Sequence, residues 1–208
     1  MTRGKFITIE GVEGVGKSTS IAFIEQYFQQ IGQEILLTRE PGGTPLAEKI
    51  RGLLLDARQT SMTDDTELLL MFAARAQHLS EKIIPALNAG QWVICDRFTD
   101  ATYAYQGGGR GIDNARIATL EAWVQGELRP DLTLLLDLPV AEGLKRAGQR
   151  SAPDRFEQEK LAFFERVRTS YLQMASDNPQ RYRVINASGT IVEVQSRIQH
   201  VLQECIAP

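Results

Sequence analysis

Cysteine and histidine are scarce in this sequence, with two residues of each among 208. Cys95 and Cys205 fit no metal-ligand or disulfide-framework spacing, so we expect both to be reduced and partly buried. His78 and His200 are isolated, and we expect structural or solvated roles for them rather than catalytic ones. These scarcities argue against a disulfide scaffold and against a cysteine-based metal site.

The sequence also lacks a long apolar run and a strong excess of one charge. No segment approaches the length of a membrane-spanning helix. The formal net charge of −3 argues against nonspecific binding to nucleic acid, although local basic sites are compatible with it. Because the chain begins almost directly with a strand pattern, we expect no signal peptide and a cytoplasmic location.

Repeats, low-complexity tracts and an obvious linker are missing as well. A length of 208 residues suits one α/β domain with a sizeable core. The apolar content of 43% is ordinary for a globular protein. We therefore expect residues 1–208 to form a single domain.

The segment Gly11–Ser18, Gly-Val-Glu-Gly-Val-Gly-Lys-Ser, is what stands out, because it fits the P-loop pattern. Its glycines let the backbone aim successive N–H groups at phosphate oxygens. Lys17 can reach the β- and γ-phosphates of a nucleotide, and Ser18 can offer its hydroxyl to Mg²⁺. A strand pattern precedes the segment and a helical pattern follows it, which is the arrangement that distinguishes a P-loop from a glycine-rich turn.

Strand and helix patterns alternate along the rest of the chain. We expect strands at about 5–10, 34–38, 92–95, 132–137 and 183–186, and helices after 18, at 45–56, from 63 or 64 to 90, from 113, from 140, around 164–174 and at 191–201. The segment 107–111 reads as a glycine-rich loop that either approaches a ligand or only turns the chain. This alternation predicts an α/β fold with a parallel sheet covered by helices on both faces, and with ligands at the carboxyl ends of its strands.

Charged residues follow the expected strands at those carboxyl ends. Arg39 begins the segment 39–44, which proline and glycines keep irregular. Asp96 can coordinate Mg²⁺ or its water, or can simply cap a helix or form a salt bridge. Arg97 can match a phosphate with its guanidinium, or can form a surface ion pair. The basic segment 150–155 resembles a mobile lid that supplies an arginine to phosphoryl transfer, with an ordinary solvated charged loop as the alternative.

Taken together, these segments resemble the bacterial thymidylate kinase family. The landmarks cover nearly the whole chain, at 9–19, 38–44, 71–75, 96–98, 104–111, 129–133 and 150–157. The resemblance implies a P-loop nucleoside monophosphate kinase-like three-layer sandwich with a five-stranded parallel sheet and a lid loop at about 148–157. It also implies a homodimer that phosphorylates dTMP to dTDP with ATP and Mg²⁺ in the synthesis of dTTP.

The resemblance assigns roles by position. Catalysis would use Lys17, Arg97, Arg150 and Arg155, with Arg150 as first choice for the arginine finger because the family's P-loop arginine position is Gly14 here. ATP would contact Gly11, Val12, Glu13, Gly14, Val15, Gly16, Lys17, Ser18 and Thr19, with Arg146 against adenine. The dTMP would contact Glu13, Arg39, Phe72, Arg75, Arg97, Thr102 and Gln106, and the metal would contact Ser18 and Asp96. The family's stacking phenylalanine position holds Met71, so either Met71 or Phe72 would cover the base, and core packing is the plain alternative for both.

Two other functions fit a P-loop. A nucleoside kinase would need a base for a hydroxyl proton and an acceptor pocket without phosphate contacts, and the several arginines argue against it. A regulatory GTPase of the common type carries an Asn-Lys-x-Asp motif, which this sequence lacks. Release of ADP with dTMP, with thymidine or without an acceptor separates these functions.

Overall fold

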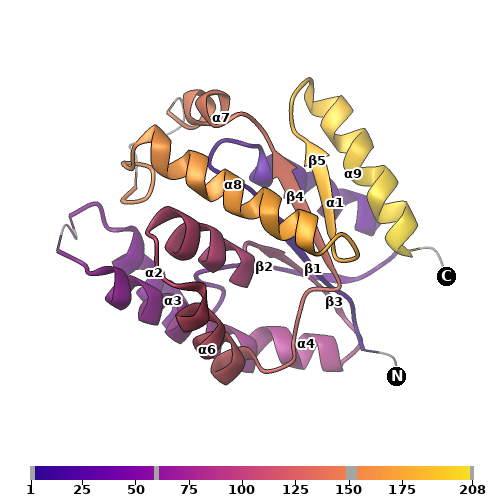
Figure 1. The fold of residues 1–208 in the computed structure, drawn as a ribbon. Coiled ribbons are helices and arrows are strands. Elements are labelled where there is room, and N and C mark those ends of the chain that lie inside the picture. The colour runs from indigo at the N-terminus through magenta and orange to yellow at the C-terminus, as the bar shows by residue number, and fades with distance from the viewer. Residues whose placement is uncertain (1–2, 59–60, 149–153, 207–208) are drawn as a thin grey trace.

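A parallel sheet lies at the centre of the fold (Figure 1). The computed structural model describes residues 3–58, 61–148 and 154–206, and within them five strands pair in the order β2-β3-β1-β4-β5. The strands are β1 Phe6–Glu10, β2 Ile35–Arg39, β3 Trp92–Asp96, β4 Leu132–Asp137 and β5 Tyr182–Asn186. The predicted parallel α/β sheet is therefore confirmed, and the register pairs Arg39 with Asp96, so the ends of β2 and β3 meet at one edge.

Helices cover both faces of this sheet. In Figure 1, α1 and α9 pack together on one face and α8 crosses the other. The helical segments are α1 Lys17–Gln30, α2 Pro45–Leu55, α3 Asp64–His78, α4 Ile84–Asn88, α5 Thr99–Thr102, α6 Asn114–Gln125, α7 Val140–Ala147, α8 Leu161–Asp177 and α9 Ile191–Ile206, with π-helical turns η1 Leu79–Ile83 and η2 Tyr103–Gly109. None of the helices in the described ranges is both long enough and apolar enough to cross a bilayer.

Helix starts follow local capping chemistry. Thr44, Thr63 and Asp113 each accept a hydrogen bond from a backbone N–H in the first turn of α2, α3 and α6, at 3.3, 3.3 and 2.9 Å. Such a side-chain cap stabilises a helix by about 0.5–2 kcal/mol. The helix starts predicted at 63 or 64 and at 113 are confirmed, with Thr63 and Asp113 as the capping residues.

The glycine-rich segment 107–111 differs from the prediction. Much of it belongs to η2, not to a loop, because η2 packs closely against α8. A Cβ atom on Gly109 would lie 2.4 Å from the ring of Phe163, and one on Gly108 would lie 2.7 Å from Ser170 Cβ. Glycine is needed here so that two helical segments can approach each other.

Candidate functional site

The P-loop connects β1 to α1 in the predicted strand–loop–helix arrangement. Gly11, Gly14 and Gly16 have positive φ angles of 139°, 73° and 99°. A Cβ atom on Gly14 would lie 1.8 Å from the carbonyl oxygen of Gly143 in α7, and one on Gly11 would lie 2.5 Å from that of Leu136. Gly11 and Gly14 are therefore required both by the positive φ and by the lack of space for a side chain, whereas Gly16 is required by its positive φ alone.

Lys17 begins α1 and turns its ammonium group back toward the loop. Its Nζ lies 3.0 Å from the carbonyl oxygen of Gly11 and 3.0 Å from that of Val12. Burial lowers the pKa of Lys17, the positive charge of Arg97 lowers it further, and Glu13 partly opposes them. A cation buried beside another cation favours a negatively charged ligand such as a phosphate.

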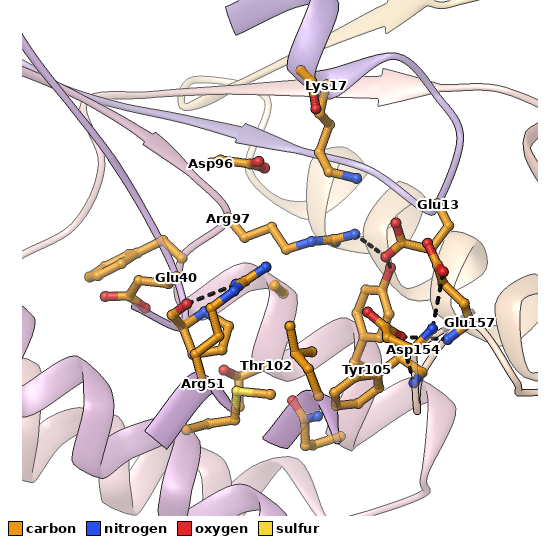
Figure 2. Close-up of a pocket in the computed structure, with 18 of the residues that line it drawn as sticks. Glu13, Lys17, Glu40, Arg51, Asp96, Arg97, Thr102, Tyr105, Asp154 and Glu157 are labelled. Atoms are coloured by element: carbon orange, nitrogen blue, oxygen red, sulfur yellow. Dashed lines mark hydrogen bonds and ion pairs between the residues drawn. The ribbon is translucent and has the colours of Figure 1, made fainter. Parts of the chain in front are cut away.

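A cavity of about 240 Å³ opens beside the P-loop (Figure 2). It lies at the carboxyl ends of β1 and β3, where a parallel sheet gathers its ligands. Charged side chains line one part and apolar side chains another. The lining residues used below are Glu13, Lys17, Ser18, Arg51, Met71, Arg75, Asp96, Arg97, Phe98, Ala101, Thr102, Tyr105 and Gln106.

Glu13 and Arg97 form an ion pair on the wall of this cavity (Figure 2). Nη2 of Arg97 donates to Oε1 of Glu13 at 2.5 Å, and the Tyr105 hydroxyl donates to the same oxygen at 3.2 Å. Burial alone would raise the pKa of Glu13, but Arg97 and Lys17 hold it at about 2. Glu13 is therefore an ionised hydrogen-bond acceptor at neutral pH.

Arg97 has a strained backbone. Among the described residues it is the one non-glycine residue with a positive φ, 66°, a conformation that costs about 1–3 kcal/mol. Its N–H donates to the Ile9 carbonyl at 3.0 Å, and Nη1 donates to the Gly11 carbonyl at 2.9 Å. The strained backbone of Arg97 thus occurs where its guanidinium is hydrogen-bonded to the P-loop.

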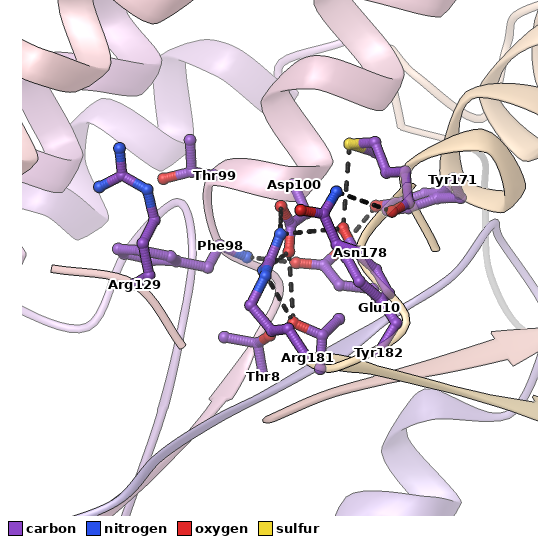
Figure 3. A network of polar contacts seen from close by, with 12 residues as sticks. Thr8, Glu10, Phe98, Thr99, Asp100, Arg129, Tyr171, Asn178, Arg181 and Tyr182 are labelled. Atoms are coloured by element: carbon purple, nitrogen blue, oxygen red, sulfur yellow. Dashed lines mark hydrogen bonds and ion pairs between the residues drawn. The ribbon is translucent and has the colours of Figure 1, made fainter. Parts of the chain in front are cut away.

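The buried side chain of Glu10 holds the backbone that directly follows Arg97 (Figure 3). Glu10 is fully buried and accepts hydrogen bonds from the Phe98 N–H and the Tyr171 hydroxyl, both at 2.7 Å. Tyr171 in turn accepts from Nη1 of Arg97 at 3.3 Å. Glu10 therefore holds Arg97 through the next backbone amide and through a tyrosine.

Glu10 should make stability depend on pH. Burial and the charge of Asp100 raise its pKa from 4.5 to about 8, so between these values the folded state keeps a proton that the unfolded chain has lost. The free energy of unfolding should therefore fall as the pH rises through that window. Between pH 4.5 and about 8, the free energy of unfolding should fall less in Glu10→Gln than in the parent. We expect the two falls to differ by about 1 kcal/mol or more, as measured by urea unfolding at several pH values. Glu34→Gln, an exposed control, should follow the parent, and parallel curves for Glu10→Gln would contradict this expectation.

Arg75 reaches the cavity from α3 and is almost completely buried. Its Nε donates to Glu40 at 2.7 Å, and its Nη2 donates to the Thr102 hydroxyl at 3.0 Å. Its Nη1 is buried and has no hydrogen-bond partner. Because an unpaired buried donor costs about 1–3 kcal/mol, this group is suited to an anionic ligand.

Asp96, like Arg75, has a buried polar atom without a partner among the described residues, but its atom is a hydrogen-bond acceptor. Its Oδ1 is buried and has no hydrogen-bond partner. Asp96 and Ser18 line both the cavity and an open groove next to it. An unpaired carboxylate oxygen beside a P-loop hydroxyl is a donor set that suits a hard cation.

Two residues that the resemblance assigned to dTMP do not line this cavity. Arg39 does not line the cavity: its side chain is 53% exposed and pairs with Glu48 at 2.9 Å. Phe72 is buried in a cluster with Leu68 and Ile117, and Met71 lines the cavity instead. The helix turns by about 100° per residue, so one position decides which side chain reaches the ligand.

The predicted lid is only partly described. Arg150 lies outside the described residues. Arg155 is described, but its Nη2 donates to Glu67 and its Nε to the Leu54 carbonyl at 2.9 Å, and it does not line the cavity. Its neighbours Asp154 and Phe156 do line it.

A second cavity of about 250 Å³ lies across the P-loop from the first. Gly14 and Gly16 line both cavities, which places the loop between them. Thr19 and Arg146 line the second one, and Arg146 pairs with Glu142 one helical turn away.

Arg51 is a cavity residue that the sequence analysis missed. It lines the cavity from α2 and donates from Nη1 to the Pro41 carbonyl at 2.8 Å. Burial and the charge of Arg39 lower its pKa. A signal was present, because Arg51 lies between the apolar Ala47 and Leu54 at helical spacing, and a charge on the buried face of a helix needs a partner.

Comparison with known proteins agrees with this geometry. The family model described as thymidylate kinase matches residues 9–198. The chain is 58% identical over 203 residues to a thymidylate kinase of Pseudomonas savastanoi pv. phaseolicola, covering 98% of this chain and 97% of the relative. It is 60% identical over 199 residues to one of Ectopseudomonas mendocina, with coverage of 96% and 95%. The crystal structure of thymidylate kinase from Ehrlichia chaffeensis superposes with a TM-score of 0.79 at 34% identity, covering 97% of this chain and 100% of that one. Because the family model spans most of the chain and the relatives match it nearly end to end, this protein belongs to the thymidylate kinase family.

Proposed function

We propose that the protein transfers the γ-phosphoryl group of ATP to dTMP, forming ADP and dTDP in the synthesis of dTTP. The observation that carries this proposal is the cavity itself. Arg75, with its unpaired Nη1, and Arg97 line it together with the P-loop Lys17. These groups can hold an acceptor phosphate against a donor phosphate, which would otherwise repel each other.

ATP would occupy the donor side. The P-loop, Gly11–Ser18, would hold its phosphates, and Lys17 would exchange two carbonyl partners for phosphate oxygens. The second cavity, lined by Thr19 and Arg146, is placed to take the adenosine part. The phosphates of ATP would then lie along the loop, between the second cavity and the first.

The acceptor would lie in the first cavity. Arg75 and Arg97 would bind its phosphate, with Arg51 as a third cation, while Met71 and Phe98 offer apolar contacts. Glu13, held at a pKa of about 2, would accept a hydrogen bond from the sugar hydroxyl. No general base is required, because a monophosphate oxygen is already a nucleophile at neutral pH.

Mg²⁺ fits the residues on the donor side. Asp96 and Ser18 would hold it, directly or through water, and the unpaired Oδ1 of Asp96 supports this. Within the described ranges no group of three or more His, Cys, Asp or Glu could hold a metal, which agrees with an ion that takes its other ligands from phosphates and water. When bound, Mg²⁺ would neutralise charge on the transferring group.

The proposal extends to the assembly. Residues 1–208 would form one domain that works as a homodimer in the cytoplasm, without nucleic acid. Large apolar side chains are exposed on neighbouring helices, Leu53 on α2, Leu69 on α3 and Trp123 on α6, at 50%, 56% and 83%. Exposed apolar side chains on helices that pack together support pairing with a second copy, and the net charge of −3 is consistent with the absence of nucleic acid.

Coupled ADP release with a panel of acceptors tests the proposal. We expect fast turnover with dTMP, slower turnover with dUMP, and turnover with thymidine lower by about 10³-fold because the phosphate contacts are lost. Preference for thymidine would instead indicate a nucleoside kinase. Hydrolysis without an acceptor would indicate a nucleotide switch. The absence of dTMP-dependent turnover in a folded protein that binds ATP would refute the proposal.

A further inference from the structure

Glu67 is a buried carboxylate outside the phosphate-binding set. It lies in α3, is 1% exposed, and does not line the cavity. Its Oε1 accepts from Nε2 of Gln106 at 2.7 Å and weakly from Nε of Arg110 at 3.4 Å. Its Oε2 accepts from Nη2 of Arg110 at 3.3 Å and from Nη2 of Arg155. The two oxygens therefore have different partners. Oε1 mainly accepts from the Gln106 amide, and Oε2 accepts from the two guanidinium groups.

This arrangement fixes the direction of the Gln106 amide. A carboxylate only accepts hydrogen bonds, so the NH₂ group of Gln106 must face Glu67. Gln106 is itself 1% exposed and lines the cavity. Among the described residues no hydrogen bond ends on its Oε1, which leaves that oxygen as the polar atom available to a ligand.

The neighbours of Gln106 suit a nucleobase. Thr102 lies one helical turn away in a continuous helical segment, and Met71, Ala101 and Tyr105 add apolar surface to the same cavity. An apolar slot with one directed polar group binds a flat heterocycle and fixes its orientation.

We infer that Glu67 is a specificity-determining positioning residue that presents Gln106 to the acceptor base as a hydrogen-bond acceptor. The inference rests on the proposed function. A pyrimidine whose ring edge offers an N–H, such as thymine or uracil, pairs with the amide oxygen. Cytosine presents a lone pair at the same ring nitrogen, so two acceptors would face each other, and a site that leaves polar groups unpaired rejects its ligand.

The variant Glu67→Gln tests this by reversing the amide. Its side-chain oxygen should go to Arg110 and Arg155, because two guanidinium groups require an acceptor. Its NH₂ group then faces Gln106, which must turn over and present NH₂ to the cavity. We expect kcat/KM for dTMP and for dUMP to fall together, by about 10- to 100-fold, the discrimination that a hydrogen-bond pattern gives.

The decisive readout is the ratio between bases. Inhibition constants of dCMP and dUMP, measured against dTMP, should show the preference for dUMP over dCMP falling by about 10- to 100-fold in Glu67→Gln. If Glu67 had a purely structural role, Glu67→Gln would weaken the binding of dTMP, dUMP and dCMP equally. That outcome would overturn the inference. Glu159→Gln is the matched control, because Glu159 also pairs with Arg110 but does not contact Gln106. Its base preference should equal that of the parent.

A second variant covers the case in which Glu67→Gln does not fold. Gln106→Met removes the directed oxygen at similar volume, and should also lose the preference for dUMP over dCMP. Retention of that preference would overturn the inference. A parent enzyme that is inactive with dTMP would refute the proposed function instead, so the two failures are distinguishable.

Discussion

Replacement of Arg97 by alanine is expected to lower kcat/KM for dTMP by about 10³-fold. Arg97 lies on the cavity wall at the end of β3, and its guanidinium is fixed by Gly11 and Glu13. Charge-assisted hydrogen bonds contribute about 1.5–3 kcal/mol each, and two of them to an acceptor phosphate account for the expected loss. Steady-state kinetics with each substrate varied should place the effect on dTMP, with the KM for ATP little changed.

Two further variants sharpen this experiment. Arg97→Lys keeps the charge but loses the planar fork, so an intermediate loss is expected. Arg58→Ala is the matched control, because its side chain is 90% exposed and pairs with Asp56. Parental kinetics in Arg97→Ala would show that the acceptor phosphate binds elsewhere.

Replacement of Lys17 by methionine is expected to lower kcat by about 10³-fold or more, since removing one preorganised charge from a phosphoryl-transfer site has effects of this size. ATP should still bind, because the backbone N–H groups of the loop remain. In the structure Nζ of Lys17 already lies at the loop, 3.0 Å from two carbonyl oxygens. The measurement is kcat at saturating substrates together with an ATP titration.

The matched control is Lys49→Met, which changes an exposed lysine on α2 in the same way. It should retain parental kcat and ATP affinity. A loss of less than about tenfold in Lys17→Met would contradict the assigned role, since a group that stabilises the transition state must lower kcat when removed. Loss of ATP binding alone, with kcat retained, would limit Lys17 to binding.

Local patterns predicted much of this protein. The P-loop, the helix starts near positions 63 and 113 and the strand positions follow from residues close together in sequence, because glycine conformations, capping bonds and apolar periodicity act over a few residues. Asp96 and Arg97 were found in the same way, since the end of a buried parallel strand is where ligands gather.

Contacts between distant segments were harder to predict. The glycines of segment 107–111 are explained by α8, which follows about fifty residues later and packs against them. The resemblance leaves either Met71 or Phe72 to cover the base, and the packing of α3 decides that Met71 lines the cavity while Phe72 is buried one position later. The resemblance assigns Arg39 to the acceptor; in the structure its side chain pairs with Glu48, and Arg51 from the next helix lines the cavity.

The sequence by itself determined the parallel α/β fold, the P-loop and the family, because each depends on short-range patterns or on many matched positions. The tertiary structure alone decided which side chains face one another. Glu10 and Phe98, and likewise Glu67 and Gln106, are 88 and 39 positions apart in sequence, and only the packing of the tertiary structure brings each pair into hydrogen-bond contact. Hydrogen bonds act over about 3 Å, so the direction of one amide or one guanidinium is fixed by neighbours that no local pattern reveals.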